Sequence, residues 1–552
     1  MTLTRSHLSV ATLIVASCFH ANAAPPAAAP AQPKLVVVLV VDGLPNEQVQ
    51  RYRHQFAAGG FNRLLRQGAS YDNAHQAHGV TVTAVGHAAV LTGAYAYQHG
   101  VIGNNWIDPN TRKSVYCTED AAFTYLGEVT KAGDGTSPAM LKVGTLGDEM
   151  RYASGNRAKV IAVSGKDRGA ILLAGKSGTA YMYMEKSGNF ASSSYYMASH
   201  PQWVQRYLQA KPQDRYYGKS WTPLLADSAY AQDADDALYA GVKGMGQRFR
   251  FTYYSDNGSI DSDYYTRLKA TPALDELTLE FARAAIEGEN LGKNPAGVAD
   301  LLGVSLSAHD YINHSFGPES KMSHDHLQRL DRMLAGFFDY LDQRVGAGNF
   351  LVVLTADHGF PNTPEFAKAA QLDAGRIDGN KLAAALDAHL AATHGVARLV
   401  AASSFPNIHL DYALATKAGL RREELELSAA RFLLSQAGVA DVFTRTQFEA
   451  GLPATRLGTL MQRAWNRHLS GDLMLVTKPY WFVSSAQSGT THGSPYAYDT
   501  SVPLMLMGPQ WIRPGRQASY AEVVDIAPTL AHLLHLRAPA TSEGRVLTEA
   551  LR

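Results

Sequence analysis

Three aspartates and three histidines are candidate metal ligands in this sequence: Asp42, Asp310, His314, Asp357, His358 and His492. Their oxygen and nitrogen donors can fill two sites with three protein ligands each. Mixed sites of this kind, with coordination positions left open, suit catalytic Zn²⁺, and Mn²⁺ or Fe binds in similar shells. Each residue taken singly also fits a turn or a surface position. Five other histidines are expected not to bind metal: His75, His78, His87, His99 and His309.

The stretch 79–105 contains the candidate nucleophile. An extended, β-branched run up to Thr83 leads into small and apolar residues that favour a helix. At such a strand-to-helix turn Thr83 lies near the positive end of the helix, where an anionic group is stabilised. We therefore expect Thr83 to be a nucleophile, with Thr81 as the second candidate; a simple helix cap is the alternative. The stretch ends near Asn104, whose amide can reach a bound ligand.

Four continuous apolar runs predict the strands that position these residues: 34–41, 158–163, 301–306 and 350–354. Runs without alternation are typical of central parallel strands that are covered on both faces. Each run leads into polar side chains, in this order: Asp42, the Lys166/Arg168 pair, the Asp310/His314 pair and the Asp357/His358 pair. Because functional groups gather at the carboxyl ends of strands in open α/β sheets, we expect these side chains to lie near one another.

The pattern between the strands predicts an α/β fold, with a mostly parallel central sheet flanked by helices. Helical periodicity is present in three segments: 274–286, 324–345 and 523–536. Three long segments interrupt the core and are expected to cap it: near 106–157, 169–273 and 361–480. The four-residue spacing of Asp310 and His314 puts both on one face of a helical turn. Asp357 and His358 are neighbours and can converge only from a loop, which Gly359 favours.

Composition limits the class of protein. Of 552 residues, 46% are hydrophobic and 18% charged, as in a soluble globular protein with a full core. The net charge of +1 provides no attraction for nucleic acid or an anionic membrane, so we expect no nucleic-acid-binding surface. Cys18 and Cys117 are the only two cysteines. If Cys18 leaves with the export signal or is lipidated, Cys117 has no partner within the chain, and the exported fold then does not depend on disulfides.

The amino terminus has the pattern of an export signal. A short basic segment, an apolar segment and a small-residue site predict that residues 1–23 are a signal peptide cleaved after Ala23. The apolar segment is too short for a transmembrane span. The alternative is a lipoprotein signal with a lipid anchor at Cys18. Residues 24–33 form a Pro/Ala linker, and the protein is expected to be periplasmic or secreted.

The motifs resemble those of the alkaline phosphatase superfamily, in the same order: Asp42-Gly43, Thr83-x-x-Gly86-His87, His99-Gly-x-x-Gly103-Asn104, Asp310-x-x-x-His314-x-x-Gly317-Pro318, Asp357-His358-Gly359 and Thr491-His492-Gly493. The run KDRGAIL at 166–172 makes the PafA-like periplasmic phosphate monoesterases the nearest resemblance. Type I phosphodiesterases and nucleotide pyrophosphatases share the core motifs but lack the Lys/Arg pair. The resemblance covers most of the chain from Lys34 onward and implies one catalytic domain over 34–552.

This resemblance implies hydrolysis of small-molecule phosphate monoesters through a phospho-threonine intermediate on a two-zinc site. One zinc would be held by Asp42, Asp357 and His358, and Thr83 would be its nucleophilic ligand. The other zinc would be held by Asp310, His314 and His492. The phosphoryl oxygens would be bound by Asn104, Lys166 and Arg168.

The charges of the expected site favour monoesters. Three carboxylates, a Thr83 alkoxide and two Zn²⁺ sum to zero, so a dianionic monoester needs further positive charge. Lys166 and Arg168 supply it, and an extended backbone would point both side chains the same way. Arginine binds two phosphoryl oxygens as a fork, whereas lysine is a point charge. A diester carries one charge and gains less from the pair.

Three other functions are compatible with parts of the sequence or excluded by it, and two positions depart from the family pattern. A phosphodiesterase or nucleotide pyrophosphatase has the same fold, and a non-catalytic exported metal-binding protein is the remote alternative. A sulfatase is disfavoured because no C/S-x-P-x-R pattern begins at Thr83. Val80 stands where the family usually has proline, which bears on the rigidity of the loop. The run YMYM at 181–184 stands where it usually has tryptophan, which bears on leaving-group preference.

Overall fold

The computed structural model describes residues 2, 32–131, 133–234, 249 and 251–552. The chain divides into the units Met1–Ala31 and Gln32–Arg552, and the architecture below is that of the second unit. The predicted signal peptide and nearly all of the linker lie outside the described residues. Across the described part of the chain, no helix is both long and apolar enough to cross a membrane.

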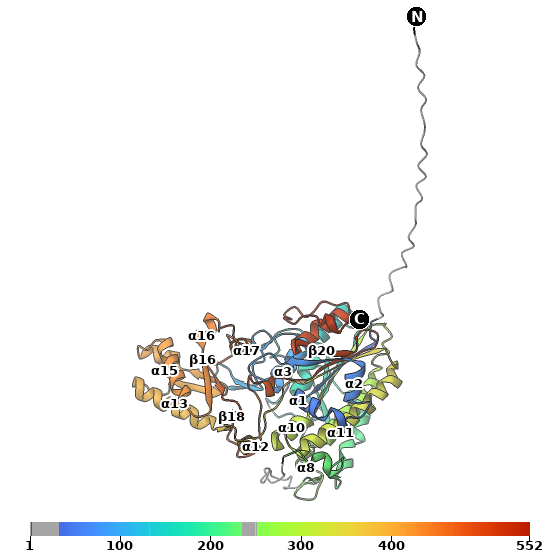
Figure 1. The fold of residues 1–552 in the computed structure, drawn as a ribbon, viewed down its shortest axis with the longest axis horizontal. Coiled ribbons are helices and arrows are strands. Elements are labelled where there is room, and N and C mark those ends of the chain that lie inside the picture. The colour runs from blue at the N-terminus through green and yellow to red at the C-terminus, as the bar shows by residue number, and fades with distance from the viewer. Residues whose placement is uncertain (1, 3–31, 132, 235–248, 250) are drawn as a thin grey trace. The chain divides into compact units, whose positions relative to one another are not determined.

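A ten-stranded mixed sheet forms the centre of the second unit (Figure 1). Its strands in spatial order are β20 (Gly515–Glu522), β2 (Ala69–His75), β19 (Leu504–Met507), β12 (Phe350–Thr355), β1 (Leu35–Val41), β11 (Asp300–Leu306), β6 (Val160–Ser164), β7 (Thr179–Tyr183), β8 (Phe190–Ser193) and β5 (Tyr125–Leu126). The block from β12 to β7 is parallel, and β19 and β8 join its two sides antiparallel. The four predicted strands are confirmed as β1, β6, β11 and β12.

Helices cover the parallel block, and every residue of β1, β11 and β12 is buried. One group of packed helices consists of α3 (Thr83–Thr92), α6 (Asp167–Ala174) and α19 (Ile526–Leu533). A second group of packed helices consists of α9 (Pro272–Glu289), α10 (Ala308–Phe316) and α11 (Lys321–Leu341). The predicted segment 274–286 lies within α9. The segment 324–345 covers most of α11 and continues into the π-helical turn Asp342–Gly346, and 523–536 covers the turn Val523–Asp525, α19 and three residues beyond it. Strands buried on both faces explain why the apolar runs show no alternation.

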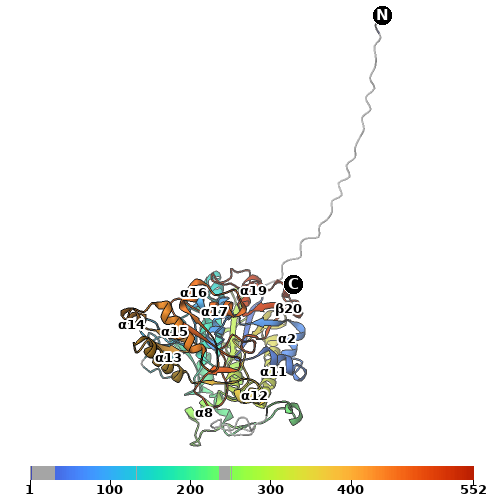
Figure 2. The ribbon, with the colours of Figure 1, turned by 60° about the vertical axis from the view of Figure 1, so that its left-hand side comes forward.

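The segment predicted as the third insertion contains a separate four-stranded sheet, shown in orange in Figure 1 and turned forward in Figure 2. Its order is β14 (Val400–Ser404), β15 (Asn407–Leu410), β17 (Leu473–Thr477) and β16 (Val439–Thr444). Helices α13 (Gly379–His394) and α15 (Arg422–Leu434) pack on it around a hydrophobic cluster that includes Leu386 and Leu433. We call the region 364–483 the inserted unit.

The segments predicted as the first two insertions belong partly to the main sheet. Strands β7 and β8 lie within 169–273, and β5 lies within 106–157. The YMYM run begins inside β7, where Tyr181 is buried against Trp203 and Phe281. The expectation that these segments only cap the core is therefore wrong in part, because polar and aromatic sequence conceals sheet strands.

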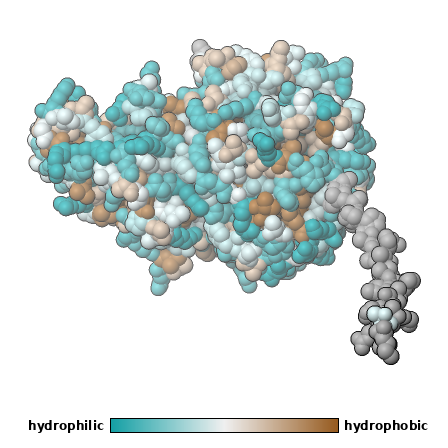
Figure 3. Space-filling model, turned by 90° about the horizontal axis from the view of Figure 1, so that it is seen from above, coloured by the Kyte–Doolittle hydropathy of each residue, from teal (hydrophilic) through white to brown (hydrophobic). Residues whose placement is uncertain are grey.

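Shorter elements connect these layers. The helices are α1 (Asn46–Tyr52), α2 (Phe61–Gln67), α4 (Ala96–His99), α5 (Leu146–Ala153), α7 (Gln202–Gln209), α8 (Ser262–Leu268), α12 (Pro364–Ala369), α14 (Tyr412–Lys417), α16 (Arg445–Ala450), α17 (Arg456–Ala464) and α18 (Ala497–Thr500). The strands pair as β3 (Asn105–Ile107) with β4 (Ser114–Tyr116), β9 (Ser220–Trp221) with β10 (Phe251–Thr252), and β13 (Gly375–Ile377) with β18 (Trp481–Val483). On the face drawn in Figure 3, apolar residues lie in separate patches on a mainly hydrophilic surface.

Candidate active site

The six predicted metal ligands come from the carboxyl ends of three adjacent strands and from one distant loop. Asp42 follows β1, the Asp357/His358 pair follows β12, and α10 after β11 carries Asp310 and His314. Since β1 lies between β12 and β11, these ends are neighbours. His492 reaches the same place from the loop before α18.

One close group contains Asp42, Asp357 and His358, all of which are fully buried. His358 Nε2 lies 3.5 Å from Asp42 Oδ1 and 3.4 Å from Asp357 Oδ2. The Asp357 carboxylate is held in place because its Oδ1 accepts from the amides of Gly43 and His358, each at 3.0 Å. This group has the composition that was predicted for one metal.

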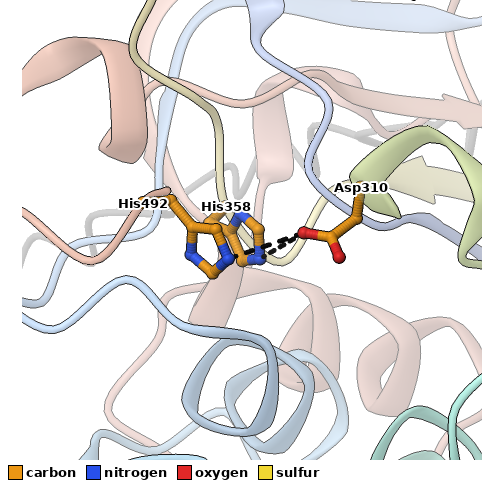
Figure 4. Close-up of side chains that lie close together, drawn as sticks. All are labelled: Asp310, His358 and His492. Atoms are coloured by element: carbon orange, nitrogen blue, oxygen red, sulfur yellow. Dashed lines mark ion pairs between the residues drawn. The ribbon is translucent and has the colours of Figure 1, made fainter. Parts of the chain in front are cut away.

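A second close group contains Asp310, His358 and His492 (Figure 4). Asp310 Oδ1 lies 3.5 Å from His492 Nε2 and 3.7 Å from His358 Nε2, and the two imidazoles stack with centroids 3.4 Å apart. His314, one turn beyond Asp310 on α10, has its Nε2 3.5 Å from the same oxygen. The residues predicted for the second metal thus lie around Asp310. His358 belongs to both close groups.

The three histidines present the same nitrogen to the cluster. Nδ1 of His314 lies 2.9 Å from the carbonyl of Thr490, and Nδ1 of His492 lies 2.7 Å from that of Thr81. Nδ1 of His358 lies 2.9 Å from its neighbour's carbonyl. A carbonyl only accepts, so each Nδ1 donates and each neutral ring keeps its lone pair on Nε2. Metal-binding histidines are oriented in this way.

Several buried atoms in the cluster have no hydrogen-bond partner among the described residues: Asp42 Oδ1, Thr83 Oγ1, Asp310 Oδ1 and His358 Nε2. Buried polar atoms are costly unless they are paired or bind a metal. The donors are carboxylate oxygens, imidazole nitrogens and one hydroxyl, which is the mixed set that suits zinc. The residues present therefore fit metal binding.

The buried carboxylates of the cluster favour positively charged groups beside them. Burial opposes ionisation of Asp42, but Lys166 and His358 hold the pKa of this carboxyl well below its usual range. Burial likewise opposes the charged form of His358, but Asp357, Asp42 and Asp310 raise its pKa to about 9. Burial lowers the pKa of His314 and of His492, which favours their neutral, ligating form.

Thr83 is the first residue of α3, and its side chain is buried. The preceding residues are loop rather than the expected strand, although Val82 has extended backbone angles. Thr81 differs from Thr83, because its hydroxyl donates to the carbonyl of Ser494 at 2.8 Å. Asn104 lies at the same helix end, where its Oδ1 accepts from the amide of Ala84 at 2.9 Å and its NH₂ remains a donor. The geometry favours Thr83 over Thr81 as the reactive hydroxyl.

A glycine in the first turn of α3 lets the helix approach the metal-ligand loop. A β-carbon on Gly86 would lie 2.0 Å from the carbonyl oxygen of Asp357. His87 in the same turn is buried, with Nδ1 3.2 Å from Asp357 Oδ2 and Nε2 2.8 Å from the hydroxyl of Ser305. The spacing Thr83-x-x-Gly86-His87 therefore fixes Thr83 relative to Asp357.

Gly86→Ala is expected to lower the free energy of unfolding by about 1–3 kcal/mol, because α3 must move away from Asp357. Thermal melting of the purified variant measures this. Gly144→Ala is the matched control, since its nearest heavy atom would be 3.9 Å away. Equal melting temperatures for the two variants would contradict the close approach.

Lys166 and Arg168 differ from their predicted arrangement. The backbone is extended at Lys166 only, and Arg168 lies in the first turn of α6. Lys166 Nζ is buried in ion pairs with Asp310 and with Asp42, the latter at 2.8 Å. The Arg168 guanidinium donates to the hydroxyl of Tyr116 at 3.1 Å. Lys166 and Arg168 therefore do not share an extended backbone, contrary to the prediction, because α6 begins one residue after Lys166.

Three residues near the cluster were missed by the sequence analysis. Tyr116 bridges Arg168 and Asp167, and the ring of Tyr311 lies 4.8 Å from Lys166 Nζ. Asp499 accepts from both backbone amides that follow His492, and so holds that loop. Tyr116 lies in a predicted insertion and has no motif. The position of Tyr311 beside Asp310 was the only available signal for these three.

The other histidines make contacts within the fold. His309 Nε2 lies 2.7 Å from Gln48 Oε1, and its Nδ1 lies 3.0 Å from His326 Nδ1. His326 in turn lies 3.1 Å from Asp275, which also accepts from the amide of Ala308 at the start of α10. This buried chain supports the helix that carries Asp310. His78 and His99 are also buried, and His75 Nε2 lies 2.8 Å from Asn73.

The whole chain has relatives among known proteins. A protein of Myroides odoratus named calcium-transporting ATPase is 35% identical, over 94% of this chain and 95% of that protein. Alkaline phosphatase PhoV of Synechococcus elongatus is 34% identical, over 95% of this chain and 94% of PhoV. The crystal structure of alkaline phosphatase PafA has a TM-score of 0.86 at 31% identity and covers 94% of this chain and 99% of PafA.

A second solved form of PafA carries substitutions of a threonine, an asparagine, a lysine and an arginine, at the spacings of Thr83, Asn104, Lys166 and Arg168 here. The family model described as type I phosphodiesterase / nucleotide pyrophosphatase matches residues 36–497, which is more than half of the sequence. With this match, the related sequences and the PafA-like fold, the chain belongs to the type I phosphodiesterase / nucleotide pyrophosphatase family.

Proposed function

We propose that this protein is an exported, zinc-dependent alkaline phosphatase that hydrolyses phosphate monoesters to an alcohol and inorganic phosphate. The observation that carries the proposal is a pair of cations beside the cluster of metal ligands, the buried Lys166 and the half-buried Arg168. Lys166 is 3% exposed and ion-paired with Asp42 and Asp310. Relatives of nearly equal length that are named alkaline phosphatases support the same reaction.

Charge decides between the candidate substrates. The proposed ligands contribute three carboxylates, and two zinc ions with a Thr83 alkoxide bring the sum to zero. A monoester dianion therefore depends on Lys166 and Arg168 for its second charge. Burial opposes their charge, but Asp310 and Asp42 raise the pKa of Lys166, and Tyr116, Tyr311 and Asp167 raise that of Arg168. Both side chains remain cationic at the working pH.

The proposed ligand sets are Asp42, Asp357, His358 and Thr83 for one ion, and Asp310, His314 and His492 for the other. When bound, two zinc ions supply Lewis acidity that favours ionisation of an alcohol nucleophile and stabilises a leaving oxygen. Thr83 Oγ attacks phosphorus, a bond to the ester oxygen breaks, and the alcohol departs. Water then attacks the phospho-threonine, which releases phosphate and restores the Thr83 hydroxyl.

The chain's own residues position this reaction. Asn104, held at the start of α3 by the Ala84 amide, donates its NH₂ to a phosphoryl oxygen. Lys166 and Arg168 stabilise the negative charge of the transferring group, which is spread over its equatorial oxygens. Donors that are already oriented need no rearrangement during the reaction.

The second candidate is a phosphodiesterase or nucleotide pyrophosphatase, which the description of the matching family favours. A non-catalytic metal-binding protein is the remote alternative. Lys166 and Arg168 separate the first two, because a diester monoanion needs one positive charge fewer.

Replacing both Lys166 and Arg168 by alanine is expected to reduce kcat/KM for p-nitrophenyl phosphate by on the order of 10²–10³-fold. The loss for bis(p-nitrophenyl) phosphate should be much smaller. Lys159→Ala is the control, because this half-exposed lysine pairs with Glu289 instead. Equal losses for the two esters would reject the monoesterase assignment.

Export is the remaining part of the proposal. The signal peptide 1–23 places the mature protein in the periplasm or outside the cell, and Cys18 is the alternative site for a lipid anchor. The intact mass of the mature protein distinguishes cleavage after Ala23 from a lipidated Cys18. A full-length mass would contradict both.

A further inference from the structure

A cavity of about 140 Å³ borders the candidate site on the side of His492. One wall belongs to the core and includes Val82, the residue before Thr83, together with Thr491 and His492. The opposite wall belongs to the inserted unit and includes Phe405 and Trp481. No step of the proposed reaction uses these aromatic residues.

The inserted-unit wall is rigid and largely apolar. The indole of Trp481 donates to Asp373 Oδ1 at 2.9 Å. β-Carbons on Gly375 and Gly438 would lie 2.6 Å and 2.3 Å from its ring, so both backbones pack directly on the indole. On the core side, Val80 is 2% exposed and packs in a cluster with Met461 and Trp465. Val80, which stands where the family usually has proline, therefore contributes an apolar side chain to the core wall.

The size of the cavity matches one aromatic ring. Dry cavities of about 150 Å³ lined by apolar side chains bind benzene. The aromatic side chains in this wall, Phe405, Trp481 and Phe482, favour contact with an apolar ring over binding of a small polar alcohol. The core wall also carries polar side chains, which include Thr491, Ser494 and Asp499, so the selection for an apolar, ring-bearing group comes from the inserted-unit wall.

The direction of the reaction relates this cavity to the substrate. In phosphoryl transfer the attacking and leaving oxygens lie roughly in line on opposite sides of phosphorus. In the proposed function, His492 belongs to the ligand set that does not include Thr83, and the ion held by that set would stabilise the leaving oxygen. The substituent on the leaving oxygen would then lie near His492, which lines the cavity.

We propose that this cavity is a leaving-group subsite that selects phosphate monoesters of ring-bearing alcohols. The inference rests on the proposed monoesterase function and adds the class of alcohol. It also assigns the inserted unit a role in specificity, since Phe405, Trp481 and Val483 all come from this unit.

The test compares phenethyl phosphate with ethyl phosphate, whose leaving alcohols are chemically similar and differ in the ring. We expect a phenethyl-to-ethyl ratio of kcat/KM of roughly 10–100 in the zinc-loaded protein. Phe405→Ala removes one wall and should lower this ratio about tenfold. Val483→Phe fills the cavity and should lower it as well. Phe432→Ala is the matched control, because Phe432 lies in the same unit but packs on His389.

Calorimetry with phenethylphosphonate and ethylphosphonate separates this inference from the proposed function. If neither ester is hydrolysed, the function fails, but tighter binding of the ring-bearing phosphonate still supports the subsite. A wild-type ratio near one in both assays overturns the inference. So does a ratio above ten that Phe405→Ala and Val483→Phe leave unchanged.

Discussion

Thr83→Ala is expected to reduce kcat for phosphate monoesters by on the order of 10³-fold or more, because it removes the proposed nucleophile. The hydroxyl of Thr83 is buried at the start of α3 and has no hydrogen-bond partner among the described residues. Thr81 lies two residues earlier, but its hydroxyl donates to the Ser494 carbonyl. Steady-state kinetics at saturating p-nitrophenyl phosphate measure the effect.

Two further variants make this result specific. Thr83→Ser keeps a hydroxyl at the same position and should retain most of the activity. Thr81→Ala removes a hydrogen bond to the His492 loop and should have a much smaller effect than Thr83→Ala. Acid quenching during turnover, followed by peptide mass spectrometry, should find a phosphorylated Thr83 peptide. Full turnover by Thr83→Ala would transfer the role to another residue.

Removing the metal is the second change with a large expected effect. Chelation should abolish hydrolysis and lower the melting temperature by several degrees, because binding to the folded state alone stabilises it by about 4 kcal/mol at a thousandfold excess over Kd. The carboxylates of Asp42, Asp310 and Asp357 are buried together, and Lys166 pairs with the first two. Zn²⁺ should restore both activity and stability.

Metal analysis identifies the ligands. The wild-type protein should bind two zinc ions per chain, and Asp357→Asn should bind about one. Asp300→Asn is the matched control, because this buried aspartate lies at the start of β11, at the opposite end from the site. Unchanged metal content in Asp357→Asn, or activity that survives full chelation, would exclude the proposed centre.

The sequence predicts the central sheet well for a physical reason. Strands β1, β11 and β12 are buried on both faces, so selection for apolar residues acts at every position. Their carboxyl ends meet because parallel neighbours end at the same edge, and this brings Asp42, Asp310 and Asp357 together. The prediction that Asp310 and His314 lie on one face of a helical turn also agrees with the structure, because both residues lie on α10.

Other features depend on contacts that no local pattern contains. The start of α6 directly after Lys166 alters the position of Arg168, and the partner of Arg168 is Tyr116 from a distant hairpin. Strand β7 was not recognised because its Tyr181 is buried by Trp203 of α7 and Phe281 of α9, which are distant in the sequence. The stacking of His358 on His492 joins segments more than a hundred residues apart in the chain.

The inserted unit illustrates the same limit. Its helices and strands have their own hydrophobic cluster, but the cavity beside His492 arises only where this unit meets the loop before Thr83. From the sequence, Val80 in place of the family's usual proline was expected to affect the rigidity of the loop before Thr83. In the structure it is buried in a cluster with residues of α17 and β16.

The most direct test of the account is a comparison of p-nitrophenyl phosphate with bis(p-nitrophenyl) phosphate on the zinc-loaded mature protein, with a chelated sample as the blank. We expect a higher kcat/KM for the monoester, and no hydrolysis of either ester after chelation. Faster cleavage of the diester at equal concentrations would contradict the account.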